Sequence, residues 1–461
     1  MQVDYQKYIK LIKQINLKEK RVQKAAVITY GCQQNVSDSE ILKGMLLQMG
    51  FEFCEKAADA DVVIFNTCAV REHAELKVYG NIGALKQVKR KRPNMRIAVC
   101  GCMMQQESVQ NEIKTKYRHV DIVFGPSLIF KFPEMLFNSI NDRKKTFELT
   151  EVLEIVENMP IERTENNKAW VTVMYGCNNF CSYCIVPYLR GRERSRQPEN
   201  IINEVKSLVA DGYKDITLLG QNVNSYGKDL ETEYDFSDLL CDLNKIEGDF
   251  WIRFMTSHPK DCSIKLIDTM ASCEKVCKQL HLPFQAGNDR VLKEMNRRYT
   301  SEQYLQLINY AKEKMPDITL TSDVIVGFPG ETYQEFCDTV KLLKAVEFDN
   351  LFTFIYSRRN GTPAAKMENQ IPAEEKSQRF NELLNALHPI SKMKNDLLLG
   401  KTLKVFVESV SKTNENVLTA KTEGGKTVDF EGSKELIGQF VKVKIIESKT
   451  WFLLGELVEG E

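Results

Sequence analysis

The hydrophobic pattern of residues 24–145 alternates short apolar runs with segments of helical spacing. The runs at 25–30, 62–65 and 97–99 are rich in β-branched residues and predict strands. Apolar residues between them recur at helical spacing, for example over 38–49, and predict helices. Strands separated by helices are typical of a parallel sheet covered on both faces, so we expect an α/β domain with a doubly wound sheet.

Residues 1–23 form a lysine-rich extension before this domain. Tyr5, Tyr8, Ile9, Ile12 and Ile15 would share one face of a helix, which predicts a packing helix. The extension lacks the apolar stretch of a secretory signal, and no segment of the chain approaches the ~18 apolar residues of a membrane helix. We therefore expect a cytoplasmic location.

The alternation resumes in residues 146–387. Six strand-like runs lie at 171–174, 216–219, 251–255, 279–282, 319–326 and 351–356, with helical patterns such as 201–210 and 301–314 between them. Six βα units in this length predict a partial (β/α)6 barrel, whose chemistry would sit at the carboxyl ends of the strands.

Residues 388–461 change to period-two alternation, for example at Leu403, Val405 and Val407. This pattern predicts a small antiparallel β-barrel of the oligonucleotide-binding type. Lysines and carboxylates balance in this segment, so its charge alone gives no argument for nucleic-acid binding.

Composition adds one useful constraint. The chain has 461 residues, 43% of them hydrophobic and 27% charged, with a net charge of zero, as expected of a globular protein with two or three cores. It also has 13 cysteines. Because a reducing compartment disfavours disulfides, metal ligation or thiol chemistry is the better interpretation of any cysteines that cluster.

One such cluster follows the first barrel strand directly. Cys177, Cys181 and Cys184 form a C-x3-C-x2-C triplet after a glycine. Thiolates at short spacings are the usual ligands of [4Fe–4S] clusters, and three ligands leave one iron open. The alternatives are a zinc knuckle whose fourth ligand lies elsewhere, or three unrelated thiols.

A second set is spread over the N-terminal domain. Cys32, Cys68 and Cys102 each follow a predicted strand within a few residues, which would bring three thiols to one edge of one sheet. Together they suggest a second three-thiolate cluster, although each alone could be a small buried hydrophobe. Cys100 is an alternative to Cys102 as the third ligand. We prefer Cys102 because it lies beyond the end of its strand, as Cys32 and Cys68 do.

The triplet on the first loop of a six-unit barrel, with an aromatic residue before its third cysteine, resembles that of the radical S-adenosylmethionine (SAM) enzymes. The resemblance implies that Tyr183 lies against the adenine of SAM. It also implies further cofactor contacts from the other strand ends, at Gly220, Gln221, Asn222, Ser257, Gln285 and Val326.

Two open-iron clusters in one chain suit sulfur insertion, and the arrangement resembles the methylthiotransferase family along nearly the whole chain. The motifs most similar to its MiaB-type branch are Tyr30-Gly-Cys-Gln-Gln-Asn35 with Asp38-Ser-Glu40, Asn66-Thr-Cys-Ala-Val-Arg-Glu72, Cys184-Ile-Val-Pro-Tyr-Leu-Arg-Gly-Arg-Glu193, Leu219-Gly-Gln-Asn-Val-Asn224 and Thr256-Ser-His-Pro259. The resemblance implies a C-terminal TRAM domain. It also implies methylthiolation of carbon 2 of N(6)-isopentenyladenosine beside the anticodon of tRNA.

The same resemblance implies two SAM molecules per turnover. One methylates a sulfur at the Cys32/Cys68/Cys102 cluster, and the other is cleaved at the second cluster to a 5′-deoxyadenosyl radical. An electron donor such as flavodoxin or ferredoxin is implied, whereas the sulfur source is left open.

Local charge gives separate support for an RNA partner. Cations recur between Lys77 and Arg96 with no carboxylate before Glu107, which fits either a solvated helix face or an RNA contact. Four arginines follow the triplet at every second position. If this segment is extended, all four face the approaching anticodon stem-loop: Arg190, Arg192, Arg194 and Arg196.

Three other functions fit parts of this evidence. Related methylthiotransferases would act on threonylcarbamoyl-adenosine in tRNA or on an aspartate of a ribosomal protein. Residues 69–72, after the second cysteine, argue against both by resemblance. A two-cluster electron-transfer module would have no catalytic role.

Overall fold

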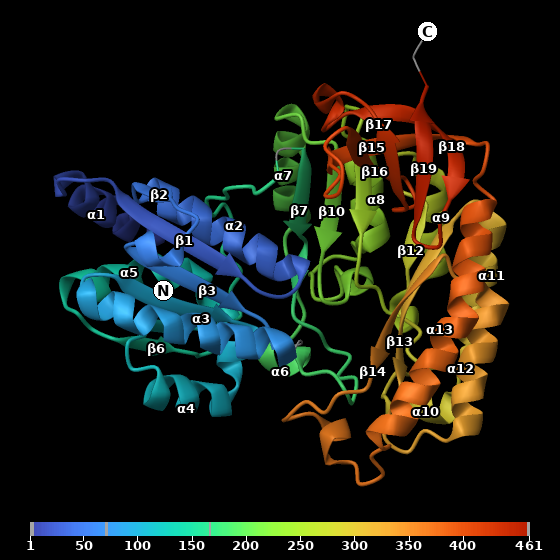
Figure 1. The fold of residues 1–461 in the computed structure, drawn as a ribbon, viewed down its shortest axis with the longest axis horizontal. Coiled ribbons are helices and arrows are strands. Elements are labelled where there is room, and N and C mark those ends of the chain that lie inside the picture. Colours follow the sequence, from blue (N-terminus) through green and yellow to red (C-terminus); the bar gives the residue numbers. More distant parts are fainter. Residues whose placement is uncertain (1–3, 70–71, 166, 459–461) are drawn as a thin grey trace. The chain divides into compact units, whose positions relative to one another are not determined.

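The computed structural model describes residues 4–69, 72–165 and 167–458. Val70 and Arg71, part of the motif at 66–72, therefore lie outside the described residues. The chain forms two compact units (Figure 1). The first contains Met1–Thr164, Tyr175–Cys177 and Ile185–Arg194, and the second contains Glu165–Met174, Asn178–Cys184 and Ser195–Glu461.

A six-stranded parallel sheet organises the first unit. Its strand order is β2 (Phe51–Phe53), β1 (Gln23–Thr29), β3 (Val62–Thr67), β4 (Arg96–Gly101), β5 (Ile122–Phe124) and β6 (Thr146–Glu148). The three predicted strands are confirmed as β1, β3 and β4. The three-residue strands β2, β5 and β6 were not predicted, and β6 extends the sheet beyond residue 145.

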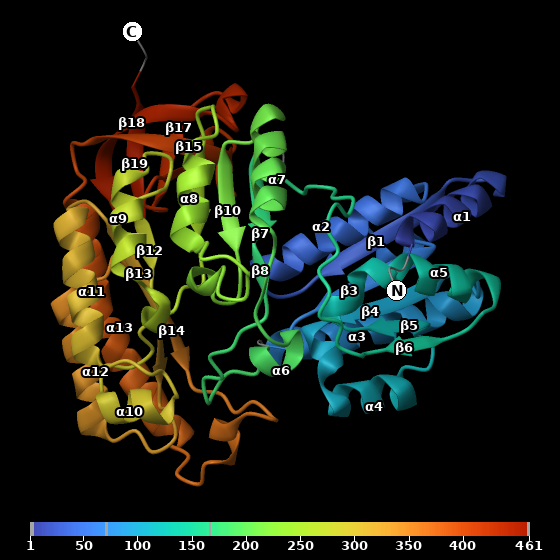
Figure 2. The same ribbon diagram turned by 180° about the vertical axis from the view of Figure 1, so that it is seen from behind.

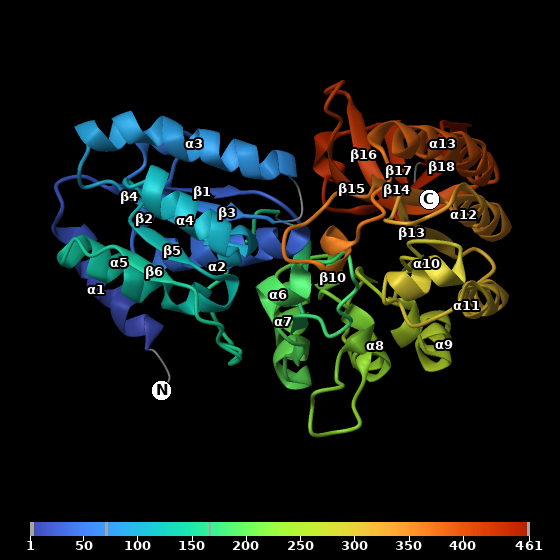
Figure 3. The same cartoon turned by 90° about the horizontal axis from the view of Figure 1, so that it is seen from below.

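Helices cover both faces of this sheet, as the doubly wound prediction required. Helices α1 (Tyr5–Lys18), α2 (Gln33–Gln48) and α5 (Phe132–Asn141) lie on one face, and α3 (Glu72–Lys91) and α4 (Glu107–Lys116) on the other (Figures 2 and 3). Strand β3 contributes side chains to the hydrophobic cores on both faces of the sheet. Ile64 packs in the same core as Leu42 on one face, and Phe65 in the same core as Ile82 on the other. Burial on both faces explains its continuous apolar run.

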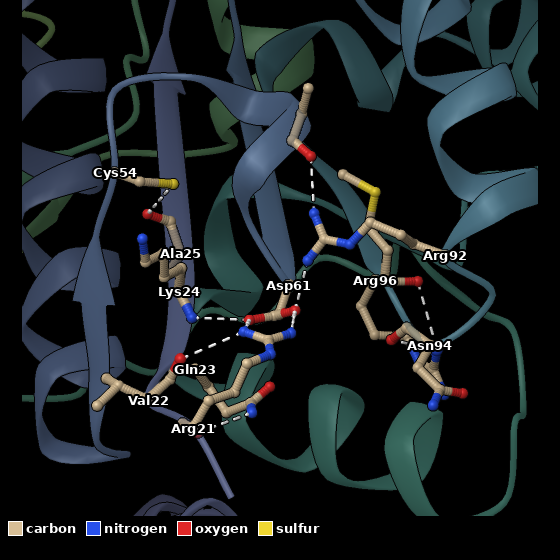
Figure 4. Close-up of polar contacts among 12 residues, drawn as sticks. Arg21, Val22, Gln23, Lys24, Ala25, Cys54, Asp61, Arg92, Asn94 and Arg96 are labelled. Atoms are coloured by element: carbon tan, nitrogen blue, oxygen red, sulfur yellow. Dashed lines mark hydrogen bonds and ion pairs between the residues drawn. The ribbon is translucent and has the colours of Figure 1, made fainter. Parts of the chain in front are cut away.

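Asp61, the residue before β3, connects neighbouring segments at the amino edge of the sheet through hydrogen bonds (Figure 4). Its carboxylate accepts hydrogen bonds from both terminal nitrogens of Arg21, from Nη2 of Arg92 at 2.6 Å and from the Lys24 N–H at 2.9 Å. Burial alone would raise the pKa of Asp61, but the hydrogen bonds from Arg21 and Lys24 hold it below its ordinary value.

The second unit contains the six predicted barrel strands. They form two three-stranded parallel sheets, ordered β11 (Trp251–Phe254), β10 (Asp215–Leu219), β7 (Lys168–Thr172) and β12 (Gln279–His281), β13 (Thr319–Val326), β14 (Asn350–Ile355). A parallel bridge between Ile252 and Val276 joins β11 to the segment that precedes β12. This is the partial barrel that the sequence predicted.

Helices between these strands complete the βα units. They are α7 (Pro198–Ala210), α8 (Phe236–Asn244), α9 (Ile264–Ser272), α10 (Asp289–Glu294), α11 (Ser301–Lys314), α12 (Tyr333–Val346) and the closing α13 (Ala373–Asp396). Local sequence explains where several begin. Thr300 and Gln303 form a reciprocal capping box at α11, as do Thr332 and Glu335 at α12.

The chain ends in a closed five-stranded barrel. Its strands are β15 (Thr402–Val410), β16 (Val417–Thr422), β17 (Thr427–Glu431), β19 (Phe452–Leu457) and β18 (Phe440–Ser448), in ring order. All neighbours are antiparallel except β17 and β19, which pair in parallel to close the ring. Within the described ranges, no helix has the length and apolar character needed to span a bilayer.

Candidate functional site

Cys32, Cys68 and Cys102 all follow the carboxyl ends of adjacent parallel strands in the first unit. Cys32 is the N-cap of α2 after β1, Cys68 directly follows β3, and Cys102 opens a short 3₁₀ helix after β4. The chain leaves β1 toward β2 on one side and continues from β3 toward β4 on the other. Such a switch point is where open α/β sheets bind ligands.

Two glycines let these loops approach closely. Gly31 has φ +116°, and a Cβ atom there would lie 2.5 Å from Cβ and 2.9 Å from Sγ of Cys68. Gly101 has φ +94°, and its Cβ would lie 2.4 Å from the Thr67 carbonyl oxygen. Only glycine fits at such positions, which explains on steric grounds why a glycine precedes the cysteine in these two motifs.

A buried amide network ties the loops of Cys32 and Cys68 together. Asn35 donates to the carbonyl oxygens of Tyr30 at 2.9 Å and Thr67 at 2.8 Å. Asn66 in turn donates to the carbonyl oxygen of Asn35 at 2.9 Å and to Oγ of Ser39 at 3.0 Å. The polar residues that accompany the cysteines in the sequence therefore fix the loops that carry them.

Glu40 anchors the end of the first unit to α2. Its carboxylate accepts from the Thr164 N–H at 3.0 Å, from the Thr164 hydroxyl at 2.7 Å and from Arg163 at 3.1 Å. The Glu40 side chain is only 2% exposed. This acidic residue of the 38–40 motif therefore has a structural role beside the cysteine loops.

Arg190, predicted to face RNA, is instead buried beside Cys102. It is the last residue of α6 (Val186–Arg190) and only 7% exposed. Its Nε donates to Sγ of Cys102 at 3.1 Å, and Nη2 donates to Asn35 at 3.0 Å and Asp38 at 2.8 Å. Burial raises the pKa of the Cys102 thiol to about 11, whereas Arg190 acts in the opposite direction.

The other three arginines do not form a common row either, because the segment is not extended throughout. Arg194 donates to the Val152 carbonyl at 2.6 Å, and Arg196 donates to Thr172 and pairs with Glu204 at 2.8 Å. Arg192 is the exposed member of the set.

The rival thiols Cys100 and Cys102 have different surroundings. Cys100 belongs to β4 and packs in the apolar core that includes Leu42 and Ile64. Cys102 packs with Ala69, Ile185 and Leu189 at the end of the strand. Burial raises the pKa of both thiols, but only Cys102 receives the hydrogen bond from Arg190.

Three cysteine thiolates are a donor set that suits an iron–sulfur cluster. Within the described residues, no group of three His, Cys, Asp or Glu side chains is arranged to hold a single metal ion. Cluster thiolates each bind a different iron and so stand further apart. Gly31 lies against Cys68, and all three cysteines follow the ends of adjacent strands, which suits three thiolates around one cluster.

The members of the second triplet belong to different units. Cys177 follows Gly176 in the first unit, and its N–H donates to the Gly191 carbonyl at 3.1 Å. Cys181 and Cys184 belong to the second unit, where the Cys184 N–H donates to the Cys181 carbonyl at 2.9 Å.

Ser182 fixes the loop between these two cysteines. Its N–H donates to the Met295 carbonyl at 3.0 Å, and its hydroxyl donates to the Glu294 carbonyl at 2.7 Å. The Ser182 carbonyl accepts from the Ala364 N–H at 2.9 Å. Hydrogen bonds to both the N–H and the carbonyl of Ser182 therefore hold the predicted ligand loop in place.

Arg297, which the sequence analysis missed, is the polar neighbour of this loop. It is 4% exposed, and Nη1 lies 3.5 Å from Sγ of Cys181 and 3.4 Å from Oη of Tyr183. Nη2 donates to the Pro283 carbonyl at 2.5 Å, and Nε donates to Tyr299 at 3.1 Å. Each predicted cysteine set therefore has one buried arginine hydrogen-bonded to one of its sulfurs.

The predicted SAM contacts fall at the carboxyl ends of barrel strands, but in different ways. A Cβ on Gly220 would lie 2.7 Å from Cγ of Met174, so the turn after β10 needs glycine. Gln221 and Asn222 follow in this turn, and Asn222 donates to Asp261 at 2.8 Å. Val326 is fully buried in the barrel core, so its side chain is not available to a ligand.

Three buried polar atoms beyond β11 and β12 lack hydrogen-bond partners among the described residues: Oγ of Ser257, Nε2 of His258 and Oε1 of Gln285. Thr256 and Gln285 also have left-handed backbones, with φ +69° and +64°. Burial lowers the pKa of His258, and Arg297 and Lys260 add to this effect, so His258 is neutral. Unpaired buried polar atoms at strained strand ends suit a polar ligand such as SAM.

A partial parallel barrel with a three-cysteine loop after its first strand defines a radical SAM enzyme. Family models agree: residues 171–343 match the Radical SAM superfamily, residues 24–125 match "Uncharacterized protein family UPF0004", and residues 396–458 match the TRAM domain. Membership implies that the chain binds SAM and an iron–sulfur cluster.

Full-length relatives identify the family. The chain is 53% identical to a tRNA-2-methylthio-N(6)-dimethylallyladenosine synthase of Acetivibrio thermocellus, over 98% of this chain and 95% of the relative. Synthases of the same name from Clostridium botulinum and Clostridium perfringens are 54% and 52% identical over 94% of this chain, and over 95% and 97% of the relative. The chain belongs to this family of methylthiotransferases.

Proposed function

We propose that this chain methylthiolates carbon 2 of N(6)-isopentenyladenosine beside the anticodon of tRNA. The similarity to synthases named for this reaction, along almost the full length, carries the proposal. The relatives described above are not named for threonylcarbamoyl-adenosine or for a ribosomal protein. A purely electron-transferring role would leave the SAM-binding barrel unexplained.

Cys177, Cys181 and Cys184 would hold one [4Fe–4S] cluster, and Cys32, Cys68 and Cys102 the other. When bound, the first supplies the electron that cleaves SAM to a 5′-deoxyadenosyl radical, and the second presents the sulfur for transfer. Two SAM molecules per turnover serve as methyl donor and radical source.

The chain's own residues hold and orient these groups. Ser182 fixes the ligand loop, Tyr183 would lie against the adenine, and Ser257 and Gln285 offer unpaired polar atoms to SAM. Reaching carbon 2 of a stacked base requires the nucleotide to be turned out of the anticodon loop. The exposed Arg192 and the TRAM barrel are the proposed RNA contacts, and flavodoxin or ferredoxin is the proposed electron donor.

Two triple substitutions separate the proposed roles. C177A/C181A/C184A should abolish 5′-deoxyadenosine formation from SAM in the anaerobic, reduced protein. C32A/C68A/C102A should still form 5′-deoxyadenosine but no methylthio-adenosine. Both products are measured by mass spectrometry, with isopentenylated tRNA as substrate. Methylthio product from either variant, or none from the intact protein, would refute the proposal.

A further inference from the structure

Arg190 is placed to act on the Cys32/Cys68/Cys102 site through one of its sulfurs. A guanidinium can only donate hydrogen bonds, so Sγ of Cys102 must be the acceptor of the 3.1 Å contact from Nε. Such a bond is strong when the acceptor is charged, which matches a ligating thiolate rather than a thiol.

The orientation of Arg190 is fixed from its other side. Nη2 donates to Oδ2 of Asp38 at 2.8 Å and to Oδ1 of Asn35 at 3.0 Å. Asp38 is itself buried, and its Oδ1 accepts from Gln34 at 3.1 Å. Because Asn35 and Asp38 lie in α2, which Cys32 caps, the guanidinium joins the loops of two of the predicted ligands.

We propose that Arg190 is a positioning residue for the N-terminal cluster, holding Cys102 in its ligating orientation and making the cluster easier to reduce. This inference rests on the proposed assignment of Cys32, Cys68 and Cys102 as ligands. Hydrogen bonds to cluster sulfurs and nearby positive charge favour the more negative, reduced state, and so raise the reduction potential.

The test uses the full-length protein with the substitutions C177A/C181A/C184A. These remove the second predicted cluster, so that only the N-terminal cluster contributes to the redox and resonance measurements. R190K keeps the charge but loses the planar fork that reaches Cys102, Asn35 and Asp38 together. R190M/D38N removes both partners of the buried pair, because R190M alone would leave Asp38 charged and unpaired. The readouts are iron bound per chain and the midpoint potential of the cluster, followed by electron paramagnetic resonance.

The midpoint potential should shift to more negative values in both R190K and R190M/D38N, because each loses the hydrogen bond from Arg190 to Cys102. R297K is the control, because Arg297 is also a buried arginine but lies beside the other cysteine set. It should leave this potential unchanged. An assembled cluster whose potential is the same in all variants, or shifts equally in R297K, would overturn the role of Arg190. Absence of any cluster in the triple-cysteine background would instead refute the ligand assignment.

An independent observation concerns cations at the opposite edge of the same sheet. A groove of about 530 Å³ lies where α3 and α4 end, lined by Lys86, Lys89, Arg90, Lys116, Arg118 and His119. Lys89 and Lys116 pair with Asp121 and Glu112, and Arg92 and Arg96 nearby are held by Asp61 and backbone carbonyls (Figure 4). Lys86, Arg90 and Arg118 are exposed, and among the described residues their side chains form no hydrogen bond or ion pair.

We infer that this groove binds the phosphate backbone of tRNA outside the anticodon loop. This inference rests on the tRNA substrate of the proposed function. The cysteines follow the carboxyl ends of the strands, whereas the groove lies at the amino edge. The six residues of β4 separate the two edges by about 20 Å at the usual rise per residue. Lysine and arginine side chains without carboxylate partners fit phosphates, which carry affinity but no sequence information.

The variant K86E/R90E/R118E tests the groove against K10E/K13E/K18E, which makes the same charge change on exposed lysines of α1. The groove variant should bind full-length tRNA at least tenfold more weakly, with a shallower salt dependence, and methylthiolate an isolated anticodon stem-loop normally. Unchanged tRNA affinity, or an equal loss in the control, would overturn the inference. Slower reduction by flavodoxin with unchanged tRNA affinity would also overturn it, in favour of an acidic protein partner. Failure of the unsubstituted protein on the stem-loop would refute the proposed function instead.

Discussion

The guanidinium of Arg297 donates a hydrogen bond to Sγ of Cys181 at 3.5 Å, from a position that is nearly inaccessible to solvent. The same nitrogen lies 3.4 Å from Oη of Tyr183. Burial alone would lower the pKa of Arg297, but the neighbouring Tyr183, Tyr299 and Cys181 hold it well above its ordinary value, so the side chain is charged.

Substituting Arg297 should therefore slow SAM cleavage. R297K keeps the charge but cannot bond Cys181, Tyr183 and the Pro283 carbonyl in one plane. A hydrogen bond to a charged group contributes about 1.5–3 kcal/mol, which corresponds to roughly a tenfold to hundredfold loss in rate. The rate of 5′-deoxyadenosine formation measures this loss. R298K, at the neighbouring exposed arginine, should react normally, and an equal loss there would contradict the prediction.

Removing the Glu40 carboxylate should destabilise the first unit. E40A leaves Arg163 buried without this partner and Thr164 without its acceptor, and breaking a buried pair costs about 3–5 kcal/mol. E40Q should cost less, because the amide oxygen can still accept from Thr164. Chemical denaturation gives the free energy of unfolding.

The control for Glu40 is an exposed pair in the same unit. K116A removes the partner of Glu112 on the surface of α4 and should cost no more than about 0.5 kcal/mol. Equal losses in E40A and K116A would show that the buried contacts of Glu40 contribute nothing particular.

Alanine substitutions at Gly176 and Gly212 should distinguish the cost of backbone strain from the cost of a steric clash. Both have positive φ values, +75° and +90°. A Cβ at position 212 meets nothing within 4 Å, so G212A should cost only the left-handed backbone penalty of about 1–2 kcal/mol. A Cβ at position 176 would lie 1.9 Å from the Arg192 carbonyl oxygen, which should add about 1–3 kcal/mol and disturb Cys177.

Thermal unfolding and bound iron check this pair. G176A should lower the unfolding midpoint more than G212A and should also lose iron, whereas G212A should keep its iron. Similar effects of both substitutions would contradict the predicted conflict with Arg192.

The buried, neutral His258 predicts an acid-dependent loss of stability. Its pKa is lowered in the folded state, so below about pH 6.5 only the unfolded chain gains this proton. The contribution of His258 is therefore complete above that pH, and it falls by about 1.4 kcal/mol per pH unit during acidification. H258N preserves an acceptor near Nδ1, which accepts from the Lys260 N–H at 3.1 Å, but does not titrate. Urea unfolding at pH 7.5, 6.0 and 5.0 should show a steeper decline for the unsubstituted protein, and parallel declines would refute the prediction.

Much of the architecture follows from local pattern. Strands β3 and β4 are largely apolar runs because they are buried along their whole length, and such runs are visible in the sequence. Strands β2, β5 and β6, which were not predicted, have three residues each and lie toward the two edges of the sheet. Helix α2 begins at Gln33, before its apolar positions, and the polar residues of its first turns show no apolar spacing from which this start could be predicted.

From the sequence alone we could predict which cysteines would act as ligands, because cysteine spacing and the position of each thiol after a strand are local properties of the chain. The surroundings of those thiols depend instead on tertiary packing. Arg190 was expected to face RNA, but it meets Asp38 across 152 positions of sequence and Cys102 across 88. Arg297 meets Cys181 across 116 positions. A buried guanidinium needs partners that satisfy its charge, and those partners are brought together by the packing of strand ends, which no local pattern encodes.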